Sequence, residues 1–424
     1  MSNEPSEDLV RAYSKSLLSG APGAEEGTLE SLVPGSDALE AHVESILDWM
    51  PDAGDRRDDI VEALDHLRTE ATLDAKDLGA LEAIIFPTKR PVSDIRNGRI
   101  VKLPKGEFRG LIENAETRRR VEKAVASVGC ILVPNDARIP YAGTGFVVGQ
   151  GLVMTNRHVA RLFAEGLGRG RISFVPGQIA QFNPRREEAN AKDDPKLQVT
   201  GVRMVHPYWD MALLEVEGLD LAPLRLASVD PSTGARRKVA VVGYPAFDPR
   251  NNTEVQNAVF RNRFFVKRLS PGYLTGRRSI PSFDNQVSAA THDASTLGGN
   301  SGSAVIDVAS GDVVALHFAG LYLDTNFAVP IAELARDARV IDAGVDFVSP
   351  SPAASLPWED HWRRTETESP ATLTAGKLAS TRQALAADGG SASVRVTIPI
   401  EVTVRVGQVV TAKAEDPTPS GLPR

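Results

Sequence analysis

The stretch GTGFVVGQGLVMTNRHVA, residues 143–160, decides the fold class. An apolar run broken by glycines ends at Thr155, and a polar turn that carries His158 follows at once. HPYWDMALLEV places Asp210 before another apolar run, and THDASTLGGNSGSAVID places Ser301 in a glycine-rich turn before a third. Short apolar runs separated by turn signals are typical of a β barrel or sandwich. We therefore predict a mainly β domain over 106–345, in which one helix at about 113–128 precedes the strands.

A histidine, an aspartate and a serine at three strand ends indicate nucleophilic catalysis. A serine hydroxyl is a weak nucleophile at neutral pH and needs an adjacent base, which imidazole can supply. A carboxylate fixes the imidazole tautomer and stabilises the imidazolium. Each residue alone has an ordinary structural explanation, but together they favour a triad of His158, Asp210 and Ser301. The glycines of GGNSGS leave the backbone N–H groups of Gly299 and Ser301 to bind an oxyanion.

These three blocks resemble the motifs of trypsin-like (chymotrypsin-fold) serine peptidases. The bacterial branch without disulfides, which includes glutamyl endopeptidases and HtrA-type proteases, is the most similar. TNRHVA resembles the histidine motif, DMALLEV the aspartate motif and GGNSGSAV the serine motif. The resemblance spans about residues 125–340 and implies two six-stranded antiparallel barrels with the triad between them. An α/β-hydrolase fits less well, because Ser301 lies in G-x-S-x-S and its histidine would follow the serine.

The resemblance also suggests where substrate would bind. In glutamyl endopeptidases a Thr or Ser and a His line the S1 pocket, and the matching residues here are Thr296 and His317. A hydroxyl and an imidazole can both donate hydrogen bonds to a substrate carboxylate, so cleavage after Glu is expected. The alternative is that His317 is a core histidine and Thr296 a turn residue. Phe318, Ala319 and Gly320 would form the strand that pairs with the substrate backbone.

One position departs from many animal members of that family. They carry an aspartate just before the serine, which pairs with a freed N-terminus after zymogen cleavage, whereas this chain has Asn300. The resemblance therefore implies that this chain has no such activation switch.

The flanks differ in composition from the β domain. Residues 1–35 are small and polar and predict disorder, and 36–90 carry apolar residues at helical spacing, which predicts a small helical bundle. Residues 91–105 and 346–390 are predicted linkers, and 413–424 a flexible tail. Alternation from Val394 to Val406 predicts a β segment at 391–412. By analogy with bacterial conflict-system proteases, the bundle would be an adaptor for a sensor or partner, and the protein a regulated effector in defence or signalling.

Composition limits the function classes. The net charge of −7 over 424 residues argues against a general nucleic-acid binder, and no apolar run is long enough for a membrane span. A single cysteine, Cys130, excludes an intramolecular disulfide, and we expect no metal and no cofactor. The start MSNEPSEDLV lacks the basic and apolar regions of a secretory signal, so a cytoplasmic setting is expected. The sequence thus predicts a serine endopeptidase acting on protein or peptide substrates; the alternative is a catalytically silent peptide-binding or scaffold module.

Overall fold

The structure is a computed structural model that describes residues 62, 90–103, 106–136, 141–188, 195–233, 236–248, 253–321 and 325–367. All of them belong to the first of two compact units, residues 1–370. The predicted disordered segment, nearly all of the predicted bundle at 36–90, the β segment at 391–412 and the tail lie outside the described residues. Those four predictions stay untested.

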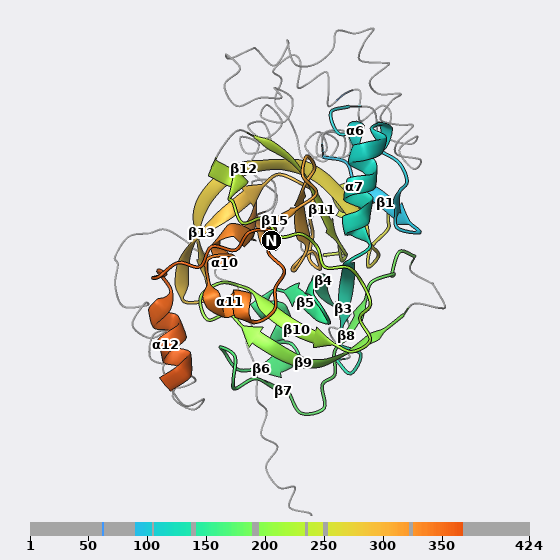
Figure 1. Cartoon of the computed structure of the whole chain (residues 1–424). Helices are drawn as coiled ribbons and strands as arrows, with labels where there is room; N and C mark the ends of the chain where they lie inside the picture. The colour runs from blue at the N-terminus through green and yellow to red at the C-terminus, as the bar shows by residue number, and fades with distance from the viewer. Residues whose placement is uncertain are drawn as a thin grey trace, which may run out of the picture. The chain divides into compact units, whose positions relative to one another are not determined.

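The first half of the β domain is a closed antiparallel barrel in the strand order β10-β5-β4-β3-β8-β9 (Figure 1). Its strands are β3 Val128–Leu132, β4 Tyr141–Gly149, β5 Leu152–Thr155, β8 Gln181–Asn183, β9 Leu197–Val205 and β10 Ala212–Val216. Every residue of β5 is buried. Val153 packs in the cluster that fills this barrel, and Met154 packs in the main core on the other face. Burial on both faces explains why the run is continuously apolar rather than alternating.

The second half is a sheet in the order β11-β14-β15-β16-β13-β12, which the pairing of β11 with β12 closes. Its strands are β11 Arg237–Gly243, β12 Arg268–Ser282, β13 Asn285–His292, β14 Ala304–Asp307, β15 Val313–Leu321 and β16 Thr325–Pro330. All of its pairings are antiparallel. The predicted pair of six-stranded antiparallel barrels is therefore confirmed.

Short helices and strands complete the described chain. The helices are α6 Gly110–Glu113, α7 Ala115–Val125, α8 Arg157–Ala160, α9 Thr253–Phe260, α10 Ile331–Leu334, α11 Ala338–Asp342 and α12 Glu359–Thr367, with a 3₁₀ turn η2 at Pro231–Thr233. Two short strands, β6 Ala164–Glu165 and β7 Ser173–Phe174, pair with each other. Asn114 caps α7, its side chain accepting a hydrogen bond from the amide of Thr117, within the helix predicted at about 113–128. In the described residues we find no helix with the length and apolarity to cross a membrane.

Two segments predicted as linkers contribute to the fold in their described parts. Strands β1 Ser93–Arg96 and β2 Arg99–Ile100 lie within 91–105, and β1 pairs with β12. Helix α12 lies within 346–390. Trp358, directly before this helix, and Trp362, within it, are both almost fully buried. These segments are mostly polar, which suggested linkers. Their few apolar side chains pack against a core that the barrels supply.

Candidate active site

His158 and Asp210 meet at one end of the first barrel. His158 lies on α8 directly after β5, and Asp210 lies in the turn between β9 and β10, which pairs with β5. The Asp210 carboxylate accepts a hydrogen bond from the His158 backbone amide at 3.0 Å, and its other oxygen is 2.6 Å from His158 Nδ1. Because the carboxylate can only accept, this contact assigns a proton to Nδ1 and leaves Nε2 as the free base.

The environment of the two groups differs sharply. The Asp210 side chain is only 5% exposed, whereas that of His158 is 40% exposed. Burial disfavours the imidazolium, but the charge of Asp210 and its hydrogen bond outweigh burial and raise the pKa of His158 above its ordinary value. The imidazole is thus a stronger base than free histidine, and it faces solvent, as a group that exchanges protons with substrate must.

Ser301 lies in the turn before β14, where both barrels contact the chain. Its carbonyl accepts a hydrogen bond from Thr144 of β4, and the next amide, that of Gly302, donates to the carbonyl of His317 on β15. Gly302 has φ +90°, and a Cβ there would lie 1.8 Å from the Thr144 carbonyl oxygen, so only glycine fits. A Cβ at Gly143 would meet both the Ser301 carbonyl and Val159 beside His158. The fold therefore brings the predicted serine and histidine segments together.

Two amides in this turn are free to act as donors. Gly299 has φ +83°, and the neighbouring amides of Asn300 and Ser303 donate to the carbonyls of Leu297 and Asn300. Within the described residues no hydrogen bond is donated by the amides of Gly299 or Ser301. These are the two donors that the sequence assigned to an oxyanion hole.

The predicted S1 residues lie on connected elements of the second barrel. His317 on β15 is buried, and its Nδ1 is 3.1 Å from Nε2 of His292 on β13. Asn326 donates through Nδ2 to the carbonyls of His292 and Ala294, which fixes its amide orientation. Thr296 donates its hydroxyl proton to the oxygen of the same amide. In this arrangement the Thr296 hydroxyl proton is engaged by Asn326, and the predicted role of Thr296 towards a substrate carboxylate stays a prediction.

The predicted substrate strand has one open edge. β14 pairs with β15 from Val313 to Leu316 only, whereas β16 pairs with β15 as far as Leu321. On the β14 side, the backbone of Phe318, Ala319 and Gly320 is thus left without a strand partner in the described chain. An extended peptide could add there as a further strand. A Cβ on Gly320 would lie 2.6 Å from Asn326 Oδ1, so glycine keeps the space beside Thr296 open.

Comparison with known proteins supports the assignment of the β domain. Residues 143–316 match the family described as trypsin-like peptidase domain. A probable serine protease of Lysobacter enzymogenes is 29% identical over 296 residues, which cover 62% of this chain and 76% of that protein. The chain thus contains a trypsin-like peptidase domain, matched over residues 143–316. Similar solved structures include the active form of the Rv3671c protease of M. tuberculosis, which is 24% identical, with 58% of this chain and 92% of that chain covered and a TM-score of 0.38. Another is the HtrA-type protease AlgW with a decapeptide, which is 16% identical, with 55% of this chain and 69% of that chain covered and a TM-score of 0.37.

Sequence reasoning missed the residues that hold the Asp210 turn of the peptidase. Asp337 is fully buried and accepts hydrogen bonds from the indole N–H groups of Trp358 and Trp362, at 2.7 and 2.8 Å. Its pKa is about 2, because these bonds and His206 outweigh burial, which acts in the opposite direction. His206 Nδ1 in turn accepts from the amides of residues 208 and 209 of the turn. The spacing of four between the tryptophans, which places them on one helix face, is the signal that could have found them.

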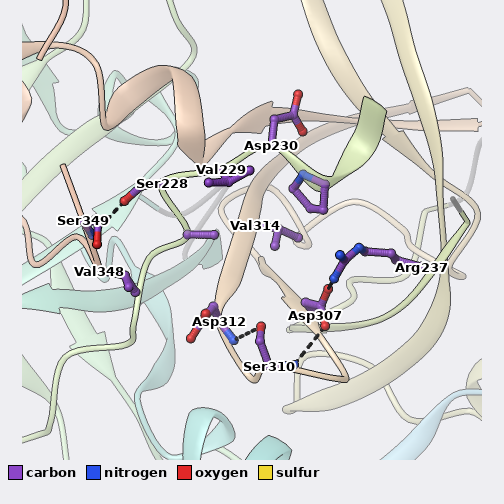
Figure 2. A pocket seen from close by; sticks show the side chains of 12 residues that line it. Ser228, Val229, Asp230, Arg237, Asp307, Ser310, Asp312, Val314, Val348 and Ser349 are labelled. Carbon is purple, nitrogen blue, oxygen red and sulfur yellow. Dashed lines mark hydrogen bonds and ion pairs between the residues drawn. The ribbon is translucent and has the colours of Figure 1, made fainter. Parts of the chain in front are cut away.

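One pocket of the peptidase lies away from these residues. It has a volume of about 450 Å³, and none of the candidate site residues lines it (Figure 2). Its acidic side chains already have partners: Asp307 pairs with Arg237, Asp312 with Arg225 and Asp230 with Arg277. Exposed Val229 and Val348 are among its apolar lining residues. Among the described residues we also find no group of three or more His, Cys, Asp or Glu side chains that could hold a metal ion.

The buried histidines of the peptidase predict loss of stability in acid. Burial lowers the pKa of His292 to about 3 and also lowers the pKa of His206 and His317. In the unfolded chain each returns to about 6.5, so below that pH the unfolded state binds more protons and unfolding is favoured. We expect the free energy of unfolding to fall by up to about 1.4 kcal/mol per pH unit per histidine as the pH drops from 6.5 towards 4.

Guanidinium unfolding at pH 7.5, 6.0 and 5.0, in a Ser301→Ala background to prevent autolysis, measures this slope. In the variant His292→Gln, the free energy of unfolding should fall less steeply with decreasing pH, by about 1.4 kcal/mol per pH unit, which corresponds to one proton. Equal slopes with and without His292 would contradict the assignment of this histidine as neutral in the folded state.

Proposed function

We propose that this peptidase cleaves proteins through an acyl-enzyme formed on Ser301. His158 Nε2 takes the proton as Ser301 Oγ attacks the scissile carbonyl, and the resulting oxyanion is bound by the amides of Gly299 and Ser301. The tetrahedral intermediate collapses as His158 returns the proton to the leaving amine, and water then hydrolyses the ester by the same route. The observation that carries this proposal is the Asp210 carboxylate, which binds both the backbone amide and Nδ1 of His158.

We propose further that the peptidase prefers Glu at P1, and Asp less often. The support is the pair His292–His317, both kept neutral by burial. His292 Nδ1 is buried and has no hydrogen-bond partner among the described residues. A buried N–H without an acceptor is costly, so the proton of His292 belongs on Nε2, where it donates to His317 Nδ1. That places the proton of His317 on its own Nε2, as a donor for a substrate carboxylate.

Matched peptides with Glu, Gln, Asp or Lys at P1 test this preference. A charge-assisted hydrogen bond contributes about 1.5–3 kcal/mol, so kcat/KM for Glu should exceed that for Gln by about 10- to 100-fold. His317→Phe should bring the Glu/Gln ratio close to one. Mass spectrometry of the cleavage products of a digested proteome, with Ser301→Ala as the blank, measures the same P1 preference without preselected peptides. A predominance of Arg, Lys or bulky apolar P1 residues would overturn the proposal.

We also propose that the protein works inside the cell as a regulated effector, with an adaptor or sensor partner bound through residues 36–90. The single cysteine, Cys130, is buried and free, as is usual for chains of reducing compartments. Co-purification of a partner with the full chain, and its loss when the apolar stripe Ile60, Val61 and Leu64 is replaced by serine, tests the adaptor role.

A further inference from the structure

The turn that carries Ser301 is held from outside the barrels by a short segment that precedes them. We name residues 90–92 the N-terminal strap and residues 293–301 the serine loop. The strap leads into β1, which pairs with β12, and all three of its residues are buried. It contacts the serine loop at three places, each by a different kind of interaction.

The first contact is a buried ion pair. The Arg90 side chain is 2% exposed, and its guanidinium is 2.6 Å from Asp293 and 2.9 Å from Glu107. It also lies over the rings of Phe108 and Tyr273, at 5.5 and 5.4 Å from their centroids. Asp293 also pairs with Arg236 at 3.1 Å, but Arg90 is the nearer and more deeply buried of its two cationic partners, so its loss weakens the hold on Asp293.

The other two contacts continue along the loop. Ser295 Oγ donates to the backbone carbonyl of Arg90 at 2.7 Å. Leu297 packs against the cluster that contains Val92 of the strap. Residues 293, 295 and 297 thus face the strap, whereas Thr296 between them faces Asn326. This alternation is that of an extended chain with one side on the strap and the other on the proposed S1 pocket.

Beyond Leu297, the serine loop is held by hydrogen bonds from Thr144 of the first barrel. The carbonyl of Gly299 accepts from the Thr144 hydroxyl at 2.8 Å, and that of Ser301 accepts from the Thr144 amide at 2.8 Å. Thr296 and the amide of Gly299 therefore lie between an anchor on the strap and an anchor on the barrel. If the strap is released, the contacts with the barrels remain, including the bond from Asn326 to the Ala294 carbonyl, but the strap side of the loop loses its ion pair with Arg90 and its hydrogen bond to the Arg90 carbonyl.

We propose that Arg90 is a positioning residue for catalysis: the N-terminal strap sets the serine loop in its active geometry, and release of the strap switches the peptidase off. This inference rests on the proposed function of Ser301 and its neighbouring amides. It also means that the chain upstream of residue 90, where the adaptor is proposed, is covalently continuous with the element that positions the oxyanion hole.

The variant Arg90→Met tests the proposal, because methionine keeps much of the apolar packing and removes the charge. We expect kcat/KM on a P1-Glu peptide to fall about 10- to 100-fold, mainly through kcat, as a shift of about 1 Å in catalytic groups costs up to 100-fold. The rate of labelling by a small fluorophosphonate should fall in parallel, and Arg90→Lys should restore part of both. Ser295→Ala, which deletes one hydrogen bond, should give a smaller loss of the same kind.

Asp94→Asn is the matched control. Asp94 follows the strap in β1, is also buried, and pairs with Arg261, Arg263 and Arg268 rather than with the serine loop. This variant should lower the thermal midpoint yet keep kcat and KM within about twofold of wild type, measured well below that midpoint.

Two results would overturn the inference: wild-type kinetics in both Arg90→Met and Ser295→Ala, or an equal loss of kcat in Asp94→Asn. If Arg90→Met does not fold, Ser295→Ala alone decides. The proposed function fails separately, by hydrolysis that survives in Ser301→Ala.

Discussion

Replacing Ser301 with alanine is expected to lower kcat for peptide hydrolysis by about 10⁶-fold. The hydroxyl is the only group that the proposed mechanism uses to form the acyl-enzyme, so its loss removes the covalent route entirely. The amides of Gly299 and residue 301 and the substrate strand remain, and these alone leave a residual acceleration of about 10³–10⁴ over water. KM should change little, because the hydroxyl does not contribute to ground-state binding.

Ser303→Ala is the matched control for this experiment. Ser303 lies two residues further along the same turn, is fully buried, and donates to Asn300 Oδ1 at 3.3 Å. Its loss should cost stability but leave kcat within about tenfold of wild type. Fluorophosphonate labelling followed by mass spectrometry should place the adduct on Ser301 in wild type. Unchanged turnover in Ser301→Ala would refute the mechanism, and a wild-type chain that takes no label would favour the silent scaffold.

Local signals in the sequence were enough to predict the barrels and to bring His158, Asp210 and Ser301 into one hypothesis. Each lies at the end of an apolar strand, and strand ends of a closed barrel gather at its rims. The glycines near Ser301 were informative for a physical reason: Gly299 and Gly302 adopt positive φ against backbone carbonyls that a side chain would strike.

The residues that support the site were not predictable in this way. Ser295 and Arg90 are 205 residues apart in the chain, and His292 and His317 are 25 apart on strands that do not pair with each other. Nothing local marks such pairs, because burial and register in the finished fold create them. Trp358 and Trp362 do carry a local signal, their spacing of four, but their polar neighbours in the sequence concealed that both indoles are buried and bound to Asp337.

Replacing Asp210 with asparagine is expected to lower kcat by about 10⁴-fold. Asparagine has nearly the same shape, so the fold should persist, but its amide can donate to His158 Nδ1 and would then hold the proton on Nε2, where the base is needed. Wild-type kcat/KM should rise with pH through a pKa above about 6.5, because Asp210 raises the pKa of His158. In the variant, burial still disfavours the imidazolium but the charge of Asp210 is gone, so the pKa of His158 falls. The acid limb of the kcat/KM profile then moves to lower pH.

A pH profile of kcat/KM from pH 5 to 9 therefore separates this role from a structural one. Asp307→Asn serves as the control, since Asp307 is also almost fully buried but binds the amides of residues 309 and 310 and Arg237. It should lower stability without moving the acid limb. If Asp210→Asn lowers kcat while the limb stays where it is in wild type, Asp210 does not set the basicity of His158, and its contact with Nδ1 serves the fold alone.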